Sequence, residues 1–390
     1  MAKLQSTSLT RRALLVGGSA ALASAAGCGQ PSAASTGNRH LRLLGEATLP
    51  FGARFGETPV GGLSGIDFDA ASGEYLLISD DRSDRAPARA YRATWRPDAA
   101  GTAPDMTALV SLRQPDGAPW PGHRNQTEGV PVPDPESIRL RRGTGTLLWT
   151  SEGDIGRGFG PSLYEASSDG VTLREFGLPA MFRPDKTGQR GPRDNRGFEG
   201  LALTPDGQRA WLAMEGALIG DGPLPTADAA GGPCRFTEVD LASGIAVRQI
   251  AYPPDAIPLP TRLPGGFADN GVSEILMLDA HRMLVLERAW SPGAGNSLRL
   301  YEIDTRAASD TLAVGALRPG NHRPAPKTLL ADFATLGLSR LDNTEGMCWG
   351  PPLPDDARGR RQRMLVVVSD NNFNPLQITQ FAAFAYTDRP

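Results

Sequence analysis

The sequence predicts an all-β fold: a β-propeller of five four-stranded blades, with six blades as the alternative. A hairpin pattern with polar, mostly acidic residues at its open end occurs five times along the chain. The first of these polar positions in successive copies are separated by 72, 63, 75 and 71 residues, close to the length of one blade. The composition, with 46 Gly, 34 Pro and 6% aromatic residues, suits many short strands joined by turns and argues against long helices.

The clearest copy of the hairpin is residues 195–216, with the sequence NRGFEGLALTPDGQRAWLAMEG. Two apolar runs flank Pro205-Asp206-Gly207, whose Pro and Gly suit a tight turn. Glu199 stands just before the first strand and Glu215 just after the second. The hairpin therefore brings both carboxylates to its open end, about 5 Å apart in strand spacing. The related copies are residues 62–82, 135–154, 271–290 and 343–373.

The first polar positions of the five hairpins are expected to meet at one mouth, because the first strand of each propeller blade lines the central channel. These positions hold Ser64, Glu136, Glu199, Glu274 and Glu345. Carboxylates this close repel one another and raise one another's pKa values. A hard cation such as Ca²⁺, which takes roughly six to eight oxygen ligands including amide carbonyls, resolves the conflict. The predicted metal ligands are Glu136, Glu199, Glu274, Glu345, Asn195, Asn270 and Asn343.

The second polar position of each hairpin is also acidic, beginning with Asp80 and Asp81 in the first copy. We expect a carboxylate of this set to accept a proton during catalysis; the candidates are Glu152, Glu215, Glu287 and Asp370. Nearby arginines either pair with the acids or bind an anionic substrate through two hydrogen bonds; they are Arg82, Arg157, Arg196 and Arg288. The alternative is architectural: the acids accept backbone N–H bonds and lock neighbouring blades together, without a metal.

Residues 40–390 are predicted to form a single domain, since no charge run or linker interrupts them. The last hairpin is followed by only one further strand, at about 380–387, which leaves the fifth blade one strand short. A weakly alternating segment at 41–49 supplies the missing strand. We therefore expect the N-terminal strand to pair with the C-terminal strand and close the ring.

The first 28 residues predict a Tat-type export signal, because the twin arginine Arg11-Arg12 precedes a short apolar run. Residues 25–28, AAGC, resemble a lipobox in which Cys28 is lipidated, while an A-x-A site at 23–25 equally suits ordinary signal peptidase. Residues 29–39 are a flexible tether. The expected location is periplasmic or secreted, either lipid-anchored at Cys28 or soluble, and the anchor is the only expected membrane contact.

Charge and residue usage exclude several classes of function. A net charge of −3 and a pI of 5.9, with no basic stripe, exclude nucleic acid as a partner. The four His residues are not spaced as zinc ligands, and the chain has no G-x-S-x-G, H-E-x-x-H or P-loop motif. Cys234 and Cys348 either form a disulfide or are two separate buried thiols. The expected partner is a small anionic or ester substrate, and the expected state is a monomer.

The order of these motifs resembles a known family. GLSGIDFD at 62–69, E-G at Glu199 and Glu345, S-E at Glu274 and S-D-N at 369–371 are together similar to the phytase-like propeller domain of "esterase-like activity of phytase family" proteins, over about residues 45–387. The resemblance implies hydrolysis of phosphate or carboxylic esters and no particular catalytic set. The resulting hypothesis is an exported, calcium-dependent hydrolase, and its alternative is a non-catalytic propeller that binds a ligand or envelope partner.

Overall fold

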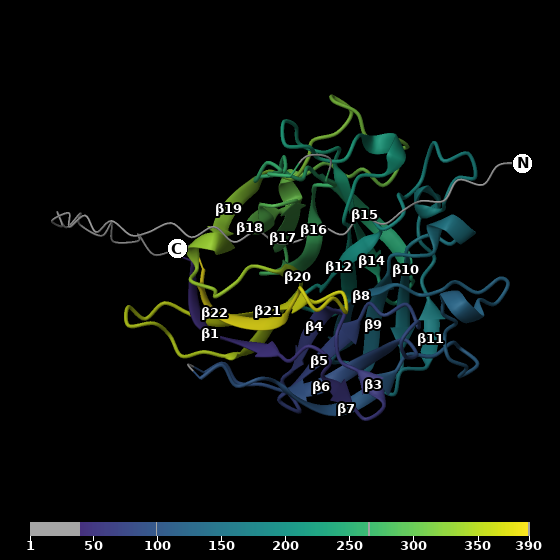
Figure 1. The fold of residues 1–390 in the computed structure, drawn as a ribbon. Helices are drawn as coiled ribbons and strands as arrows, with labels where there is room; N and C mark the ends of the chain where they lie inside the picture. Colours follow the sequence, from purple (N-terminus) through teal and green to yellow (C-terminus); the bar gives the residue numbers. More distant parts are fainter. Residues whose placement is uncertain (1–39, 99, 264–265, 389–390) are drawn as a thin grey trace, which may run out of the picture. The chain divides into compact units, whose positions relative to one another are not determined.

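A computed structural model describes residues 40–98, 100–263 and 266–388, and shows five four-stranded antiparallel sheets arranged around a centre (Figure 1). The five-bladed propeller prediction is confirmed. From the innermost strand outward, the blades are β4 (Leu63–Asp69), β5 (Glu74–Ser79), β6 (Arg89–Thr94) and β7 (Asp105–Ser111); β8 (Pro135–Arg141), β9 (Thr146–Ser151), β10 (Ser162–Ala166) and β11 (Thr172–Glu175); β12 (Phe198–Leu203), β13 (Arg209–Met214), β14 (Cys234–Asp240) and β15 (Ile245–Tyr252); β16 (Asp269–Met277), β17 (Arg282–Ser291), β18 (Gly295–Asp304) and β19 (Lys327–Asp332); and β20 (Asn343–Pro352), β21 (Gln362–Asp370), β22 (Thr379–Thr387) and β1 (Leu41–Leu49).

The first strands of the blades form the inner wall of the ring. β4 contacts β8, and the contacts continue through β12, β16 and β20 back to β4. β2 (Arg54–Phe55) and β3 (Thr58–Pro59) form a small separate pair. Among the described residues, helical structure is limited to single 3-10 turns in the connections, at His123–Asn125, Ile155–Arg157, Ala180–Phe182, Ile219–Asp221, Thr305–Ala307 and Phe333–Thr335.

The ring is closed by the two ends of the domain, as the sequence predicts. β1 pairs antiparallel with β22, from Leu41 opposite Tyr386 to Leu49 opposite Thr379. The N-terminal strand thus completes the blade of β20, β21 and β22. Pairing the ends of the chain within one sheet leaves the backbone groups of β22 bonded on both sides and spares the molecule an open sheet edge.

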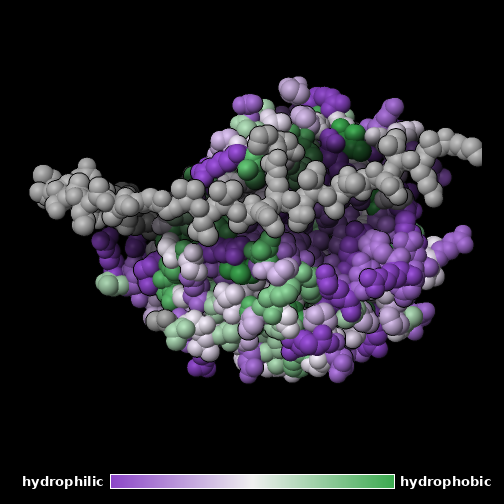
Figure 2. Space-filling model, viewed as in Figure 1, coloured by the Kyte–Doolittle hydropathy of each residue, from purple (hydrophilic) through white to green (hydrophobic). Residues whose placement is uncertain are grey.

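The hydrophobic core lies between adjacent blades. Four clusters of buried apolar residues join blades in turn, and each contains side chains from at least two sheets. Trp149 and Trp211, from the second strands of two blades, are among the largest fully buried side chains. Figure 2 shows hydrophilic residues gathered over β8 to β11 on one face, beside smaller hydrophobic areas. The rigid packing between blades therefore holds the inner strands in place.

Every inner strand contains a register shift near its start, and this irregularity positions the site. The residue at the shift has no partner on the second strand, whereas its neighbours before and after do. The residues at this bulge are Ser64, Glu136, Glu199, Ser273 and Glu345. A β-bulge re-aims one side chain without disturbing the remaining ladder, so the five residues share one orientation.

The two cysteines of the propeller are separate buried thiols, so the disulfide alternative is wrong. Cys234 lies on β14 and Cys348 on β20. The predicted export signal at 1–28, with Cys28, and the tether at 29–39 lie outside the described residues. In the part of the chain that the structure describes, none of the helices has the length and apolar character needed to cross a membrane.

Candidate functional site

The site is built from two sets of side chains at one end of the ring. The first set is the five bulge residues. The second set is the residue that follows the end of the ladder on each second strand: Asp80, Glu152, Glu215, Arg288 and Asp370. Seven of these ten residues are therefore carboxylates, and we call the seven, with the neighbouring Asp134, the acid mouth. The predicted convergence of the acids holds for four of the five blades.

The fourth blade differs from the prediction because its register is displaced by one residue. Ser273, and not Glu274, occupies the bulge of β16, and Glu274 pairs with Leu286. The Oε2 of Glu274 lies 2.7 Å from Nη2 of Arg139 and accepts a hydrogen bond from Ser137 at 2.8 Å. Its Oε1 accepts the backbone N–H of Leu201. Glu274 is thus a fully bonded residue between the inner strands and does not join the predicted ligands.

Glu287 is displaced by the same shift. It pairs with Val272, and Arg288 holds the position that an acid holds in the other blades. Tyr252 donates to its carboxylate at 2.6 Å, and Lys327 forms an ion pair with it at 2.5 Å. Asn270 donates a third bond at 2.9 Å, which places this predicted metal ligand in the Glu287 network too. Neither Glu287 nor Asn270 belongs to the acid mouth.

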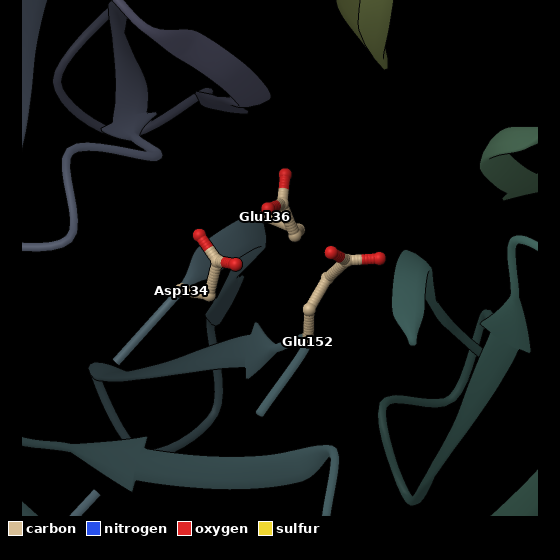
Figure 3. A group of neighbouring side chains, drawn as sticks. All are labelled: Asp134, Glu136 and Glu152. Atoms are coloured by element: carbon tan, nitrogen blue, oxygen red, sulfur yellow. The ribbon is translucent and has the colours of Figure 1, made fainter. Parts of the chain in front are cut away.

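The remaining acids form two overlapping groups. In the first, one oxygen each from Asp134, Glu136 and Glu152 lies within 4.8 Å of the others (Figure 3). In the second, the same holds for Glu152, Glu199 and Glu215. All five residues are buried, and Figure 3 shows the first three carboxylates turned toward a common space. Glu152 belongs to both groups, so it lies between two places where a cation would find several oxygens.

Close packing of glycine helps to bring these acids together. The backbone N–H of Gly197 donates to Oε1 of Glu152 at 2.7 Å. A Cβ at Gly197 would lie 2.5 Å from the carbonyl oxygen of Glu152, and one at Gly271 would lie 2.7 Å from Cγ of Glu215. A larger residue at either position would push the neighbouring blade's acid out of place.

Burial makes these carboxylates reluctant to ionise. Burial, followed by the negative charge of Glu199, raises the pKa of Glu136 well above its usual value. The pKa values of Glu199 and Glu152 are raised in the same way, with burial again the largest cause. Burial raises the pKa of Glu345 to about 8, although the positive charge of Arg288 opposes this.

Several carboxylate oxygens lack any partner. Within the described ranges, the side chains of Glu136 and Glu199 make no hydrogen bond or ion pair, and the buried Oε2 atoms of Glu199 and Glu215 are without a donor. Native proteins rarely leave buried polar atoms unsatisfied. Backbone bonding between blades, the architectural alternative, therefore does not account for Glu136 and Glu199. The unmet oxygens indicate a place for a positive ion.

The four predicted substrate-binding arginines are paired with acids, which was the other outcome considered for them. Arg196 lies 2.6 Å from Glu215 and 2.7 Å from Asp269, and Arg288 lies 3.2 Å from Glu215 and 3.3 Å from Glu345. The other two arginine pairs are Arg82 with Asp134 at 3.3 Å and Arg157 with Asp154 at 2.9 Å. Arg196 and Arg288 thus neutralise part of the acid mouth.

The predicted asparagine ligands do not offer oxygens to the two groups. The side-chain N–H of Asn343 donates to Glu345 at 2.8 Å and to Asp370 at 3.4 Å, so it orients two acids by hydrogen bonding. Asn195 is exposed and has a positive φ of 52°. A non-glycine residue rarely adopts this conformation, and such positions concentrate at functional sites.

Asp134 was missed in the sequence, although a local signal existed. The five hairpins align on the apolar residue of the inner strand, namely Ile66, Ile138, Leu201, Ile275 and Met347. That alignment places Asp134 at the position of Gly62, Gly197, Gly271 and Asn343, and it also places Ser273 in the bulge. Matching the acidic letters instead of the apolar ones produced the one-residue error in the fourth blade.

Comparison with known proteins adds the following findings. No curated protein matches the chain. Solved structures with a similar course of the chain include hydrazine synthase of Kuenenia stuttgartiensis (11% identity, 84% of this chain and 82% of that chain, TM-score 0.36). The periplasmic gluconolactonase of Pseudomonas aeruginosa (14%, 85% and 90%, 0.36) and a protein of unknown function from Dyadobacter fermentans (9%, 89% and 100%, 0.39) are also similar. Because these TM-scores are below 0.5, we infer nothing about this chain from them. The family model described as "Phytase-like: Esterase-like activity of phytase" matches residues 58–373, and the chain belongs to this family.

Proposed function

We propose that this propeller is a calcium-dependent hydrolase of phosphate or carboxylic esters, acting at the acid mouth. The observation that carries the proposal is the excess of buried carboxylates: Glu136 and Glu199 lack partners, beside Glu152, in a ring with few positive charges. Membership of the phytase-like family supports ester hydrolysis.

The donor set fits Ca²⁺ better than a transition metal. All five side chains in the two groups are carboxylates, and hard cations prefer oxygen ligands, whereas zinc sites usually contain His or Cys. The residues that would hold the ion are Asp134, Glu136, Glu152, Glu199 and Glu215. A bound cation would polarise an ester oxygen as a Lewis acid. It would also relieve the repulsion that raises the pKa values of these acids.

Asp370 is the best placed of the predicted proton acceptors. It is buried in the same ring but belongs to neither group of candidate ligands. The backbone N–H of Asn372 donates to it at 2.8 Å and fixes its orientation. Burial raises the pKa of Asp370 to about 6, close to the pH at which a general base works efficiently. Arg288, which lies beside Glu345, would stabilise negative charge developing nearby.

We also propose that the protein acts outside the cytoplasm, on the strength of the twin arginine at Arg11-Arg12 and the lipobox ending at Cys28. Replacing Arg11-Arg12 by Lys-Lys should leave the precursor in the cytoplasm. Cys28→Ala should then move the exported protein from the membrane fraction to the soluble fraction if Cys28 is lipidated. Unchanged export of the Lys-Lys variant would contradict the proposal.

The decisive experiment is metal analysis of the purified protein, followed by a panel of phosphate and carboxylic esters with and without a chelator. We expect bound Ca²⁺, turnover of at least one ester, loss of turnover and of thermal stability with chelator, and recovery of both on adding Ca²⁺. Protein that binds no Ca²⁺ and keeps its melting temperature in chelator would contradict the proposed hydrolase. A non-catalytic ligand-binding propeller would then be the better explanation.

A further inference from the structure

A cavity of about 380 Å³ adjoins the acid mouth on the side of the first blade. Asp80, a member of the mouth, lines one side of it. The other lining residues come from the loop after β5, the 3-10 turn at His123–Asn125 and the segment after β21. The cavity and the acid mouth thus share one wall.

Positive charge predominates in this cavity once the local pairs are counted. Asp81 is neutralised by Arg89 at 2.6 Å and accepts three backbone N–H groups. Asp84 pairs with His123 at 3.1 Å. By contrast, the exposed guanidinium groups of Arg85 and Arg124 have no acidic partner among the described residues. Two unpaired guanidinium groups therefore line a hollow beside Asp80.

One wall of the cavity is held rigidly against the inner strands. Arg85 stacks over the ring of Phe373, with 4.5 Å between the guanidinium carbon and the ring centroid. That ring packs on Gly62, where a Cβ would lie 2.7 Å from it. Asn372 and Phe373 have positive φ values of 48° and 49°. Non-glycine residues in this conformation are costly and are kept where the surrounding structure demands them.

The opposite wall is also fixed before any ligand arrives. A Cβ at Gly122 would lie 2.5 Å from the carbonyl oxygen of Ser83, so the turn carrying Arg124 rests directly on the loop carrying Arg85. The backbone N–H of His123 donates to Asp84 at 3.0 Å and ties the two segments together. Arg85 and Arg124 are thereby presented to the same hollow with little freedom left in the backbone that carries them.

We propose that this cavity binds the phosphate group of the substrate through Arg85 and Arg124, so that the enzyme acts on phosphate esters in preference to uncharged carboxylic esters. Guanidinium groups match phosphate oxygens in geometry, and two of them suit a doubly charged anion. The adjoining acid mouth would bind a cation, so one wall separates a positive and a negative binding surface. The proposal rests on the proposed function for the reaction itself, but the phosphate site can be measured without turnover.

The test is calorimetric titration of inorganic phosphate into the full propeller, with and without Ca²⁺. We expect Arg85→Ala combined with Arg124→Ala to raise the phosphate dissociation constant at least tenfold. Arg85→Lys, which keeps the charge, should lose less. Arg358→Ala is the matched control, because Arg358 is equally exposed but lies in the loop after β20, at the far end of that strand from Glu345. It should bind phosphate like the wild type.

Turnover gives a second measure. The Arg85→Ala and Arg124→Ala variants should raise KM for p-nitrophenyl phosphate and leave KM for p-nitrophenyl acetate unchanged. Equal phosphate affinity of wild type and double variant, or no phosphate binding by the wild type, would overturn the phosphate site even if esters are hydrolysed. Conversely, arginine-dependent phosphate binding by a protein that hydrolyses no ester would support the site and contradict the proposed function.

Discussion

Two sets of buried acids lie one residue apart on the same inner strands, and they differ in whether they have partners. Glu274 is bonded to Arg139, Ser137 and the backbone of the next blade. Glu136 and Glu199, in the bulges, have no bonds from the described residues. Both sets pay the cost of burial, but only the first recovers it through contacts within the protein.

Arg139 shows how complete the first set is. Besides the ion pair with Glu274, its guanidinium donates to the carbonyl oxygens of Ile66 and Met347 at 2.8 and 3.1 Å. Arg139 therefore connects its own blade with three others across the centre of the ring. The comparison teaches that the acids between the inner strands stabilise the ring, whereas the acids at the mouth await a ligand from outside.

The largest effect is expected from Arg139→Ala, because removing one partner of a buried ion pair leaves the other charge unpaired. We expect a loss of about 3–5 kcal/mol in the free energy of unfolding, measured by urea denaturation. The Ca²⁺ affinity of the folded protein should not change. If the loss is well below 1 kcal/mol, Glu274 and Arg139 do not stabilise the ring, and the distinction between the two sets of acids disappears.

Glu199→Gln tests the other set. Removing a charge from a cation site should weaken Ca²⁺ binding by about 10- to 100-fold, measured by calorimetry, while the metal-free protein should be no less stable because an unpartnered charge is lost. Glu274→Gln is the matched control: the same chemical change at a bonded acid should lower stability and leave Ca²⁺ affinity alone. Unaltered Ca²⁺ affinity in Glu199→Gln would place the cation elsewhere or nowhere.

The pH dependence should distinguish the two states of the mouth. Burial raises the pKa of Asp134 to about 6, that of Asp370 to about 6 and that of Glu345 to about 8, so the folded protein binds protons more tightly than the unfolded chain. The stability of the metal-free protein should therefore fall as pH rises between about 4 and 8. Ca²⁺ affinity should rise over the same range, by about tenfold or more, because the ligands must lose protons. Melting temperatures in chelator that stay level or increase with pH would be incompatible with an uncompensated acid mouth.

The smallest effect is expected from Ser273→Ala. In the fourth blade the bulge residue is a serine, and its hydroxyl donates to the carbonyl oxygen of Thr344 in the next blade at 3.2 Å. Losing this bond should cost about 1 kcal/mol in the free energy of unfolding, by thermal or urea denaturation. Ca²⁺ affinity should be unchanged. Weaker Ca²⁺ binding by this variant would show that the bulge serines also belong to the cation site.

The sequence by itself determined the five blades, the closing strand and the meeting of most acids at one end. Apolar alternation and turn residues such as Pro205 and Gly207 act over a few positions, so each hairpin can be predicted locally. The pairing of Leu41–Leu49 with the last blade followed from counting strands. Even the register of the fourth blade was present in the apolar residues around Ile275.

The tertiary structure alone decided which acids are satisfied. The partners of Glu274 and Glu287, namely Arg139 and Lys327, are far from them in sequence, and Arg139 comes from a different blade. No local pattern distinguishes Glu274 from Glu199, since both precede an apolar run. The two side chains differ because a β-bulge directs one to the mouth and its absence directs the other between the inner strands. Whether a buried charge finds a partner depends on the neighbouring blades, and their positions are set only when the ring closes.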